Sequence, residues 1–234
     1  MRIGIFGDSF ADDVMHRDYA NYPSWVELLR TRYNMNVTNF AAAGSSLYYS
    51  FNLLKLNYFK FDKIIFVVTA SGRITIPEYI PIIDARTKHI NSLFTAEHIL
   101  ANDWPPITPE NKKAVEAARD YFLYLYDHDR EQLFHDLMIE RLQKMFTDKI
   151  IIIDALPKDI ATGMISISNK EISGNGLDPM DFRHNDARMC HMTKRNNEIF
   201  AEKVVAWLNG QPVEINLDDY VIPDKEELIQ YKRL

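Results

Sequence analysis

The residues best placed to do chemistry are a serine near the N-terminus and a histidine near residue 190. Ser9 follows the apolar run 3–6 and the turn-forming Gly-Asp pair at positions 7 and 8. His191 stands just before an amphipathic segment that Thr193 can cap as a helix. A serine hydroxyl becomes a nucleophile when an imidazole removes its proton, and a third group then orients that imidazole. The pair therefore indicates acyl transfer, with Ser9 as nucleophile and His191 as general base.

Such a reaction also needs an acid to orient the histidine and donors for the developing oxyanion. Asp186, five residues before His191, is the first choice for the acid. Asp154, at the end of a buried run, is the second, and a Ser-His dyad without an acid is the third. The backbone N–H groups of Ser9 and Gly44 are the candidate oxyanion donors.

The elements that must position these residues alternate between strand and helix. Apolar runs at 3–6, 63–68 and 149–153 predict strands, a short second strand is expected at 37–40, and helical patterns separate them. This order indicates an α/β fold with a parallel sheet and right-handed crossovers. Ligands of such sheets bind at the carboxyl ends of the strands. We therefore expect the residues that follow the strands to gather at one edge.

The remaining segments complete a single domain. We expect helices at 47–58 and 194–208, and two helices within 110–146 that part around residues 127–129. Five prolines in 74–109 argue against a long regular element there, so this segment is predicted to be an insertion over the sheet edge. The segments 11–21 and 158–186 are expected to be polar loops, the first solvated or rimming a cleft. Domain 1–209 is then followed by a peripheral tail, 210–234.

Composition excludes several classes of protein. The chain has 234 residues, 47% of them hydrophobic, which is enough for a sizeable core. A net charge of −6 with a pI near 5.6 argues against nucleic-acid binding. The single Cys190 leaves no disulfide framework, and we expect no cofactor or metal. No apolar run reaches the ~18 residues of a membrane span, and Ser9 follows the first strand too closely for a signal peptide. We therefore expect a cytoplasmic protein.

Taken together, these motifs resemble those of the SGNH (GDSL-type) hydrolases, a family of serine esterases. The segment Gly-Asp-Ser-Phe at 7–10 matches the nucleophile block, and Asn-Phe-Ala-Ala-Ala-Gly at 39–44 matches the strand-and-glycine block. The segment 186–193 with its trailing helix is similar to the histidine block. The resemblance implies a flavodoxin-like three-layer α/β/α sandwich with Ser9, His191 and the amides of Ser9 and Gly44 in the roles given above. It further implies a small acyl ester as substrate, with an O-acetyl ester of a carbohydrate as the expected class, and a phage-encoded protein released by lysis is an alternative origin.

Two departures from the family pattern matter. The family's third block carries an oxyanion Asn, whereas residues 69–72 read Thr-Ala-Ser-Gly. Ser71 or Arg73 could supply that donor. Arg73 could instead bind an acidic group of the substrate or form a surface salt bridge. Loss of one oxyanion donor costs ~100- to 1,000-fold in rate. The family's acid usually stands three residues before the histidine, but that position is Arg188, which is why Asp186 is preferred.

Two other functions stay open. A metallophosphoesterase can also begin with a strand and Gly-Asp, but the chain lacks the later His-rich ligand runs of that class. A catalytically silent carbohydrate-binding or virion structural protein on the same fold is the stronger alternative, because of the missing Asn. The oligomeric state and the identities of the acyl group and the alcohol are left open.

Overall fold

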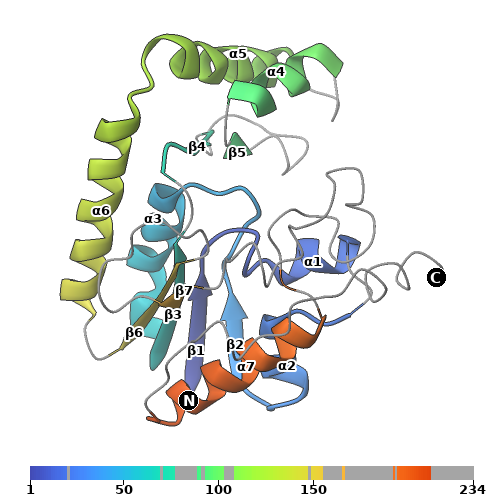
Figure 1. Ribbon diagram of the computed structural model, residues 1–234, viewed down its shortest axis with the longest axis vertical. Coiled ribbons are helices and arrows are strands. Elements are labelled where there is room, and N and C mark those ends of the chain that lie inside the picture. The colour runs from blue at the N-terminus through green and yellow to red at the C-terminus, as the bar shows by residue number, and fades with distance from the viewer. Residues whose placement is uncertain are drawn as a thin grey trace.

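The structure is a computed structural model that describes residues 1–19, 22–68, 71–76, 89–90, 93–102, 108–146, 149–154, 165–166, 192 and 194–211. Its centre is a sheet of five strands in the order β2-β1-β3-β6-β7, and every pairing is parallel (Figure 1). The strands are β1 (Arg2–Phe6), β2 (Asn36–Asn39), β3 (Lys63–Val68), β6 (Ile150–Asp154) and β7 (Ile165–Ser166). The predicted α/β class with a parallel sheet is confirmed.

Helices cover both faces of this sheet because the central strands are apolar on both sides. On one face, alternate residues such as Ile65 and Val67 of β3 pack with α2 (Trp25–Thr31) and α7 (Lys194–Leu208). On the other, Phe66 and Val68 pack with α3 (Leu47–Asn57) and α6 (His128–Met145). A strand that is buried on both sides is typical of a parallel sheet. The 3₁₀ helix η1 (Tyr58–Lys60) leads from α3 into β3.

The described residues of 74–124 build a small unit with a core of its own, which extends beyond the predicted insertion of 74–109. It contains the antiparallel pair β4 (Ile74–Thr75) and β5 (His89–Ile90), followed by α4 (Leu93–Asn102) and α5 (Pro109–Tyr124). Ile90, Ile99 and Val115 are central members of its core. The prediction that 74–109 holds no long regular element is wrong for α4, which lies between the prolines. The proline at the start of α5 fits the first turn of a helix, where its missing N–H has no partner to lose.

The predicted break within 110–146, which separates α5 from α6, is confirmed. Helix α5 ends at Tyr124, and the Asp127 side chain accepts a hydrogen bond from the Arg130 amide to cap α6. A capping carboxylate satisfies an N–H that the helix itself cannot. The helices predicted at 47–58 and 194–208 are also present as α3 and α7.

Two predicted polar loops differ from the expectation. Residues 165–166 pair with β6 as strand β7, so the sheet has one more strand than predicted. Within 11–21, Asp13–Tyr19 forms helix α1, and Asp13 and His16 are buried rather than solvated. His16 is held by its ring Nε2, which lies 2.9 Å from the Tyr22 carbonyl oxygen. Polar residues can be buried in this way when they have partners.

Among the described helices, none is both long enough and apolar enough to cross a membrane. The predicted peripheral tail lies outside the described residues from position 212 onwards.

Candidate functional site

Strand β1 ends in a tight turn that carries Ser9. The carbonyl oxygen of Asp8 accepts hydrogen bonds from the amides of Ala11 and Asp12, both at 3.0 Å, so one helical turn begins directly after the strand. Gly7 opens the turn at φ +153°, and a Cβ there would lie 2.6 Å from the Cβ of Val67 on β3. Only glycine fits this conformation and this close approach. The sequence prediction that Ser9 stands in a turn at the carboxyl end of a strand is therefore confirmed.

The side chain of Asp8 stabilises this turn by hydrogen bonds. It is completely buried, and its Oδ1 accepts a hydrogen bond from the Phe10 amide at 3.2 Å. Its Oδ2 accepts one from Arg73 Nη1 at 2.7 Å. Because the Arg73 side chain is only 11% exposed, the ion pair is buried. The alternative of a salt bridge for Arg73 is therefore observed, although not at the surface, and the pair joins the segments that follow β1 and β3.

The segment after β2 is held against the same turn. The Ala42 amide donates to the Gly7 carbonyl at 3.0 Å, and the Ala43 amide donates to Asp12 Oδ2 at 2.9 Å. Gly44 follows at φ +74°, a left-handed conformation that favours glycine. Within the described part of the chain, the amide of Gly44 donates to no acceptor. The two predicted backbone donors, Ser9 and Gly44, thus lie on adjoining segments at one sheet edge.

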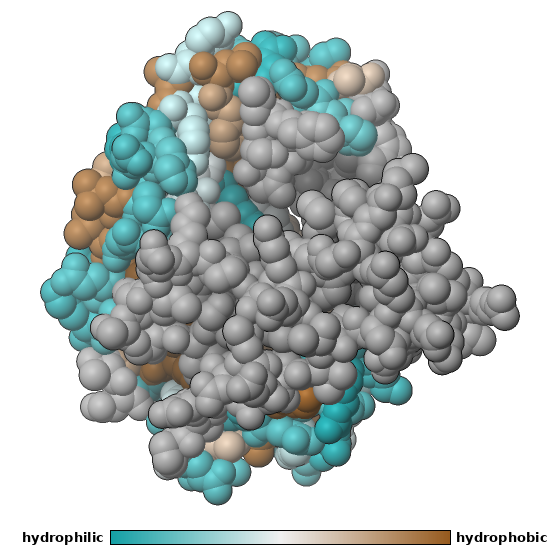
Figure 2. All heavy atoms as spheres, viewed as in Figure 1, coloured by the Kyte–Doolittle hydropathy of each residue, from teal (hydrophilic) through white to brown (hydrophobic). Residues whose placement is uncertain are grey.

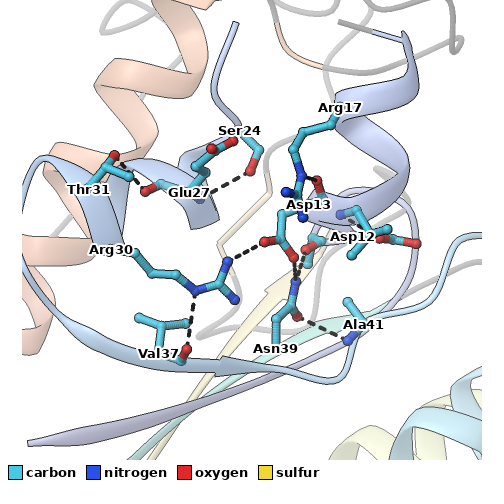
Figure 3. A network of polar contacts seen from close by, with 12 residues as sticks. Asp12, Asp13, Arg17, Ser24, Glu27, Arg30, Thr31, Val37, Asn39 and Ala41 are labelled. Atoms are coloured by element: carbon cyan, nitrogen blue, oxygen red, sulfur yellow. Dashed lines mark hydrogen bonds and ion pairs between the residues drawn. The ribbon is translucent and has the colours of Figure 1, made fainter.

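A polar network that the sequence analysis missed braces these two segments (Figure 3). Asn39 Nδ2 donates to the Ala11 carbonyl at 2.6 Å and to Asp13 Oδ1 at 2.5 Å, and Asn39 Oδ1 accepts from the Ala41 amide at 3.0 Å. Arg30 of α2 donates to Asp13 Oδ2. Burial raises the pKa of Asp13, but the hydrogen bonds from Asn39 and Arg30 outweigh it and hold the pKa below its usual range.

The start of α7 is tied to the segment after Ser9 by a relay of hydrogen bonds. The carbonyl of Met192 accepts from the Asn197 side chain at 2.9 Å, and Asn197 Oδ1 accepts from the Trp25 amide at 2.8 Å. Trp25 Nε1 donates to the carbonyl of Phe10, the residue after Ser9, at 2.8 Å. Met192 and Phe10 also belong to one core cluster. The backbone next to position 191 is therefore linked to the backbone next to Ser9.

The side chains of three predicted site residues lie outside the part of the chain that the structure describes. His191 and Asp186, the predicted base and acid, lie outside the described residues. Asp154 is the last residue of β6 and pairs in register with Val68, but its side chain also lies outside the described part.

Ser71 lies on the segment after β3, where its hydroxyl donates to Gln132 Oε1 of α6 at 3.2 Å. The neighbouring Gly72 adopts φ +76°, and a Cβ there would lie 2.4 Å from the Tyr126 ring. The segment is thus packed closely against the region between α5 and α6. Ser71 and Arg73, the two predicted replacements for the missing Asn, each have a protein partner.

No group of three or more His, Cys, Asp or Glu side chains within the described ranges could hold a metal ion. No protein-family model and no curated protein matches this chain.

Proposed function

We propose that the protein is a serine esterase of the SGNH type. The observation that carries the proposal is the turn at Ser9, which is anchored by Asp8 and joined to the Gly44 segment by two backbone amides. In this mechanism His191 accepts the proton of the Ser9 hydroxyl as its oxygen attacks an ester carbonyl, and the amides of Ser9 and Gly44 stabilise the oxyanion. The ester C–O bond then breaks, and the alcohol leaves with the proton that His191 returns to it. The resulting acyl-enzyme is then hydrolysed by water.

The fold supports the same proposal. A sheet order of second, first, third, fourth and fifth strand is the order of flavodoxin-like folds, in which ligands bind outside the carboxyl ends of the strands. Helices on both faces fit the three-layer sandwich of the SGNH hydrolases. The hydrogen-bond relay from Met192 to Phe10 supports a base at position 191 that reaches Ser9.

For the substrate we propose a small acyl ester, with an O-acetylated carbohydrate as the natural class. We propose that Arg73 contributes either to the reaction rate, as an oxyanion donor, or to substrate binding, as a partner for a carboxylate. Its ion pair with Asp8 uses a single N–H of the guanidinium, and Arg73 has no other protein partner among the described residues. Within the part of the chain that the structure describes, the guanidinium therefore has further N–H donors that a third oxyanion contact or a substrate carboxylate could use.

The test is hydrolysis of p-nitrophenyl acetate by the purified chain, with Ser9→Ala and His191→Ala as variants. We expect both substitutions to reduce kcat by at least ~1,000-fold while the circular dichroism spectrum stays that of the wild type. If wild-type activity does not exceed that of Ser9→Ala, the alternative of a silent binding protein on this fold takes its place. The hydrogen bond that engages the Ser71 hydroxyl with Gln132 is the observation that favours that alternative.

A further inference from the structure

Helix α6 is apolar on two sides, and only one of them is covered in the described structure. Its inner side places Ile139 and Leu142 in the core beneath the sheet. Its outer side exposes Phe134, Leu137 and Met145 by 54%, 50% and 46%. A solvent-facing helix normally carries one apolar stripe, so a second stripe of large side chains indicates a contact surface.

These side chains line an open groove of about 800 Å³ on the outer face of α6. The groove is lined by Tyr48, Glu131, Phe134, Leu137, Met138, Glu140, Arg141, Lys144 and Met145. Figure 2 shows the apolar patch over α6, with hydrophilic residues on either side of it. The surface is therefore an apolar strip with charged rims, and among the described residues all of its lining except Tyr48 comes from α6.

The spacing along this strip is that of a helix-to-helix contact. Glu131, Phe134, Met138, Arg141 and Met145 succeed one another at intervals of three and four residues. Intervals of three and four residues bring side chains onto one face of a helix, as in helices that pack side by side, and here Glu131 and Arg141 add charge to that face while Met138 also packs against the core. The best-fitting occupant of the groove is therefore another amphipathic helix.

The charges of the strip are complementary to those of a second copy of α6. A two-fold axis makes the two copies run in opposite directions. If the axis passes between Leu137 and Met138, each Leu137 meets the Met138 of the other copy. The same register sets Glu131 against Lys144 and Phe134 against Arg141. The first of these is an oppositely charged pair and the second a cation–π pair, and Met145 meets Arg130 of the other copy.

We propose that the protein forms a two-fold symmetric dimer through antiparallel packing of α6 against its copy. Helix α6 has 18 residues, so the seam is about 27 Å long. One helix face buries less than the ~800 Å² per partner of a standard stable interface. The dimer is therefore a weak one, with a dissociation constant in the micromolar range. The proposal does not depend on the chemistry at Ser9.

Sedimentation velocity from about 1 to 300 µM tests the dimer. We expect the average molecular mass of the wild type to rise with concentration from 27.3 kDa towards twice that value. Leu137→Glu should weaken the association at least 10-fold, because it places two carboxylates at the axis. The matched control is Leu56→Glu, at an exposed leucine of α3 that does not line the groove, and it should associate like the wild type. A wild type that stays monomeric throughout, or a Leu137→Glu variant that associates like Leu56→Glu, would overturn the proposal.

Oxidative cross-linking tests the register. In the proposed register the two copies of residue 137 are offset by about 1.5 Å along the helices, and the two copies of residue 133 by about 13 Å. A disulfide needs Cα atoms within about 7 Å. Leu137→Cys should therefore form a covalent dimer and Leu133→Cys should not, with the wild type as the background from Cys190. Equal cross-linking of the two variants would contradict the antiparallel contact.

Discussion

The buried ion pair between Asp8 and Arg73 makes the sharpest prediction about stability. Arg73→Met removes the cation and leaves the completely buried carboxylate of Asp8 with the Phe10 amide as its one remaining donor among the described residues. Removal of one partner from a buried pair costs about 3–5 kcal/mol. We expect a loss of about 3 kcal/mol, because Arg73 itself is slightly exposed. With a urea m-value of about 2.5 kcal/mol/M, the unfolding midpoint should fall by about 1 M.

The control for this prediction is an ion pair at the surface. Arg32 Nη2 lies 3.8 Å from Glu202 Oε1, and both side chains are half exposed. Such pairs contribute little, so Arg32→Met should leave the midpoint nearly unchanged. Adding Asp8→Asn to Arg73→Met should recover part of the loss, because the uncompensated charge is then gone. Equal midpoints for Arg73→Met and Arg32→Met would refute the reasoning.

The remaining predictions concern the acid-sensitive network, the turn, the acid of the triad and the role of Arg73. Because the folded-state pKa of Asp13 is lowered, its contribution to stability is present above its unfolded pKa of about 3.9. That contribution is lost as pH falls through the folded-state pKa, so urea midpoints should decline less between pH 5 and pH 2 in Asp13→Asn than in the wild type. Gly7→Ala should lower the thermal midpoint by about 4–8 °C, equivalent to about 2 kcal/mol, because its Cβ would meet Val67. Asp186→Asn should lower kcat on p-nitrophenyl acetate far more than Asp154→Asn, and the opposite ranking would make Asp154 the acid. If Arg73 is an oxyanion donor, Arg73→Met should lower kcat on every ester, whereas a clamp for substrate carboxylates would raise KM only for acidic sugars.

Much of the fold could be predicted because the signals are local and strong. The continuous apolar run at 63–68 is typical of a strand buried on both faces, and it is β3. The cap at Asp127 and the change in apolar pattern around it fix the break between α5 and α6. Strand β7 has two residues, too few to carry a periodic pattern, so it was missed.

The parts of the site that could be predicted are those set by local sequence, whereas pairings between residues far apart in the chain could not be predicted. The turn at Ser9 and the glycine at 44 follow from strand ends and small residues. The pairing of Asp8 with Arg73 spans 65 positions, and no local pattern reports which distant cation meets a carboxylate. The same holds for Asp13, which was expected in a polar loop but is buried against Asn39 and Arg30. The Gly-Asp-Ser pattern shows that an aspartate is present but not which partner it has.

The most direct test of a nucleophilic Ser9 is covalent labelling with an organophosphonate esterase inhibitor, followed by peptide mass spectrometry. A hydroxyl that an adjacent base activates is phosphonylated, whereas an ordinary surface serine is not. We predict one adduct per chain, located on the peptide that contains Ser9, with p-nitrophenyl acetate hydrolysis lost in proportion to labelling. No adduct should form in Ser9→Ala or His191→Ala. An unlabelled wild-type chain, or an adduct on another residue that abolishes activity while Ser9 stays unmodified, would contradict the proposed mechanism.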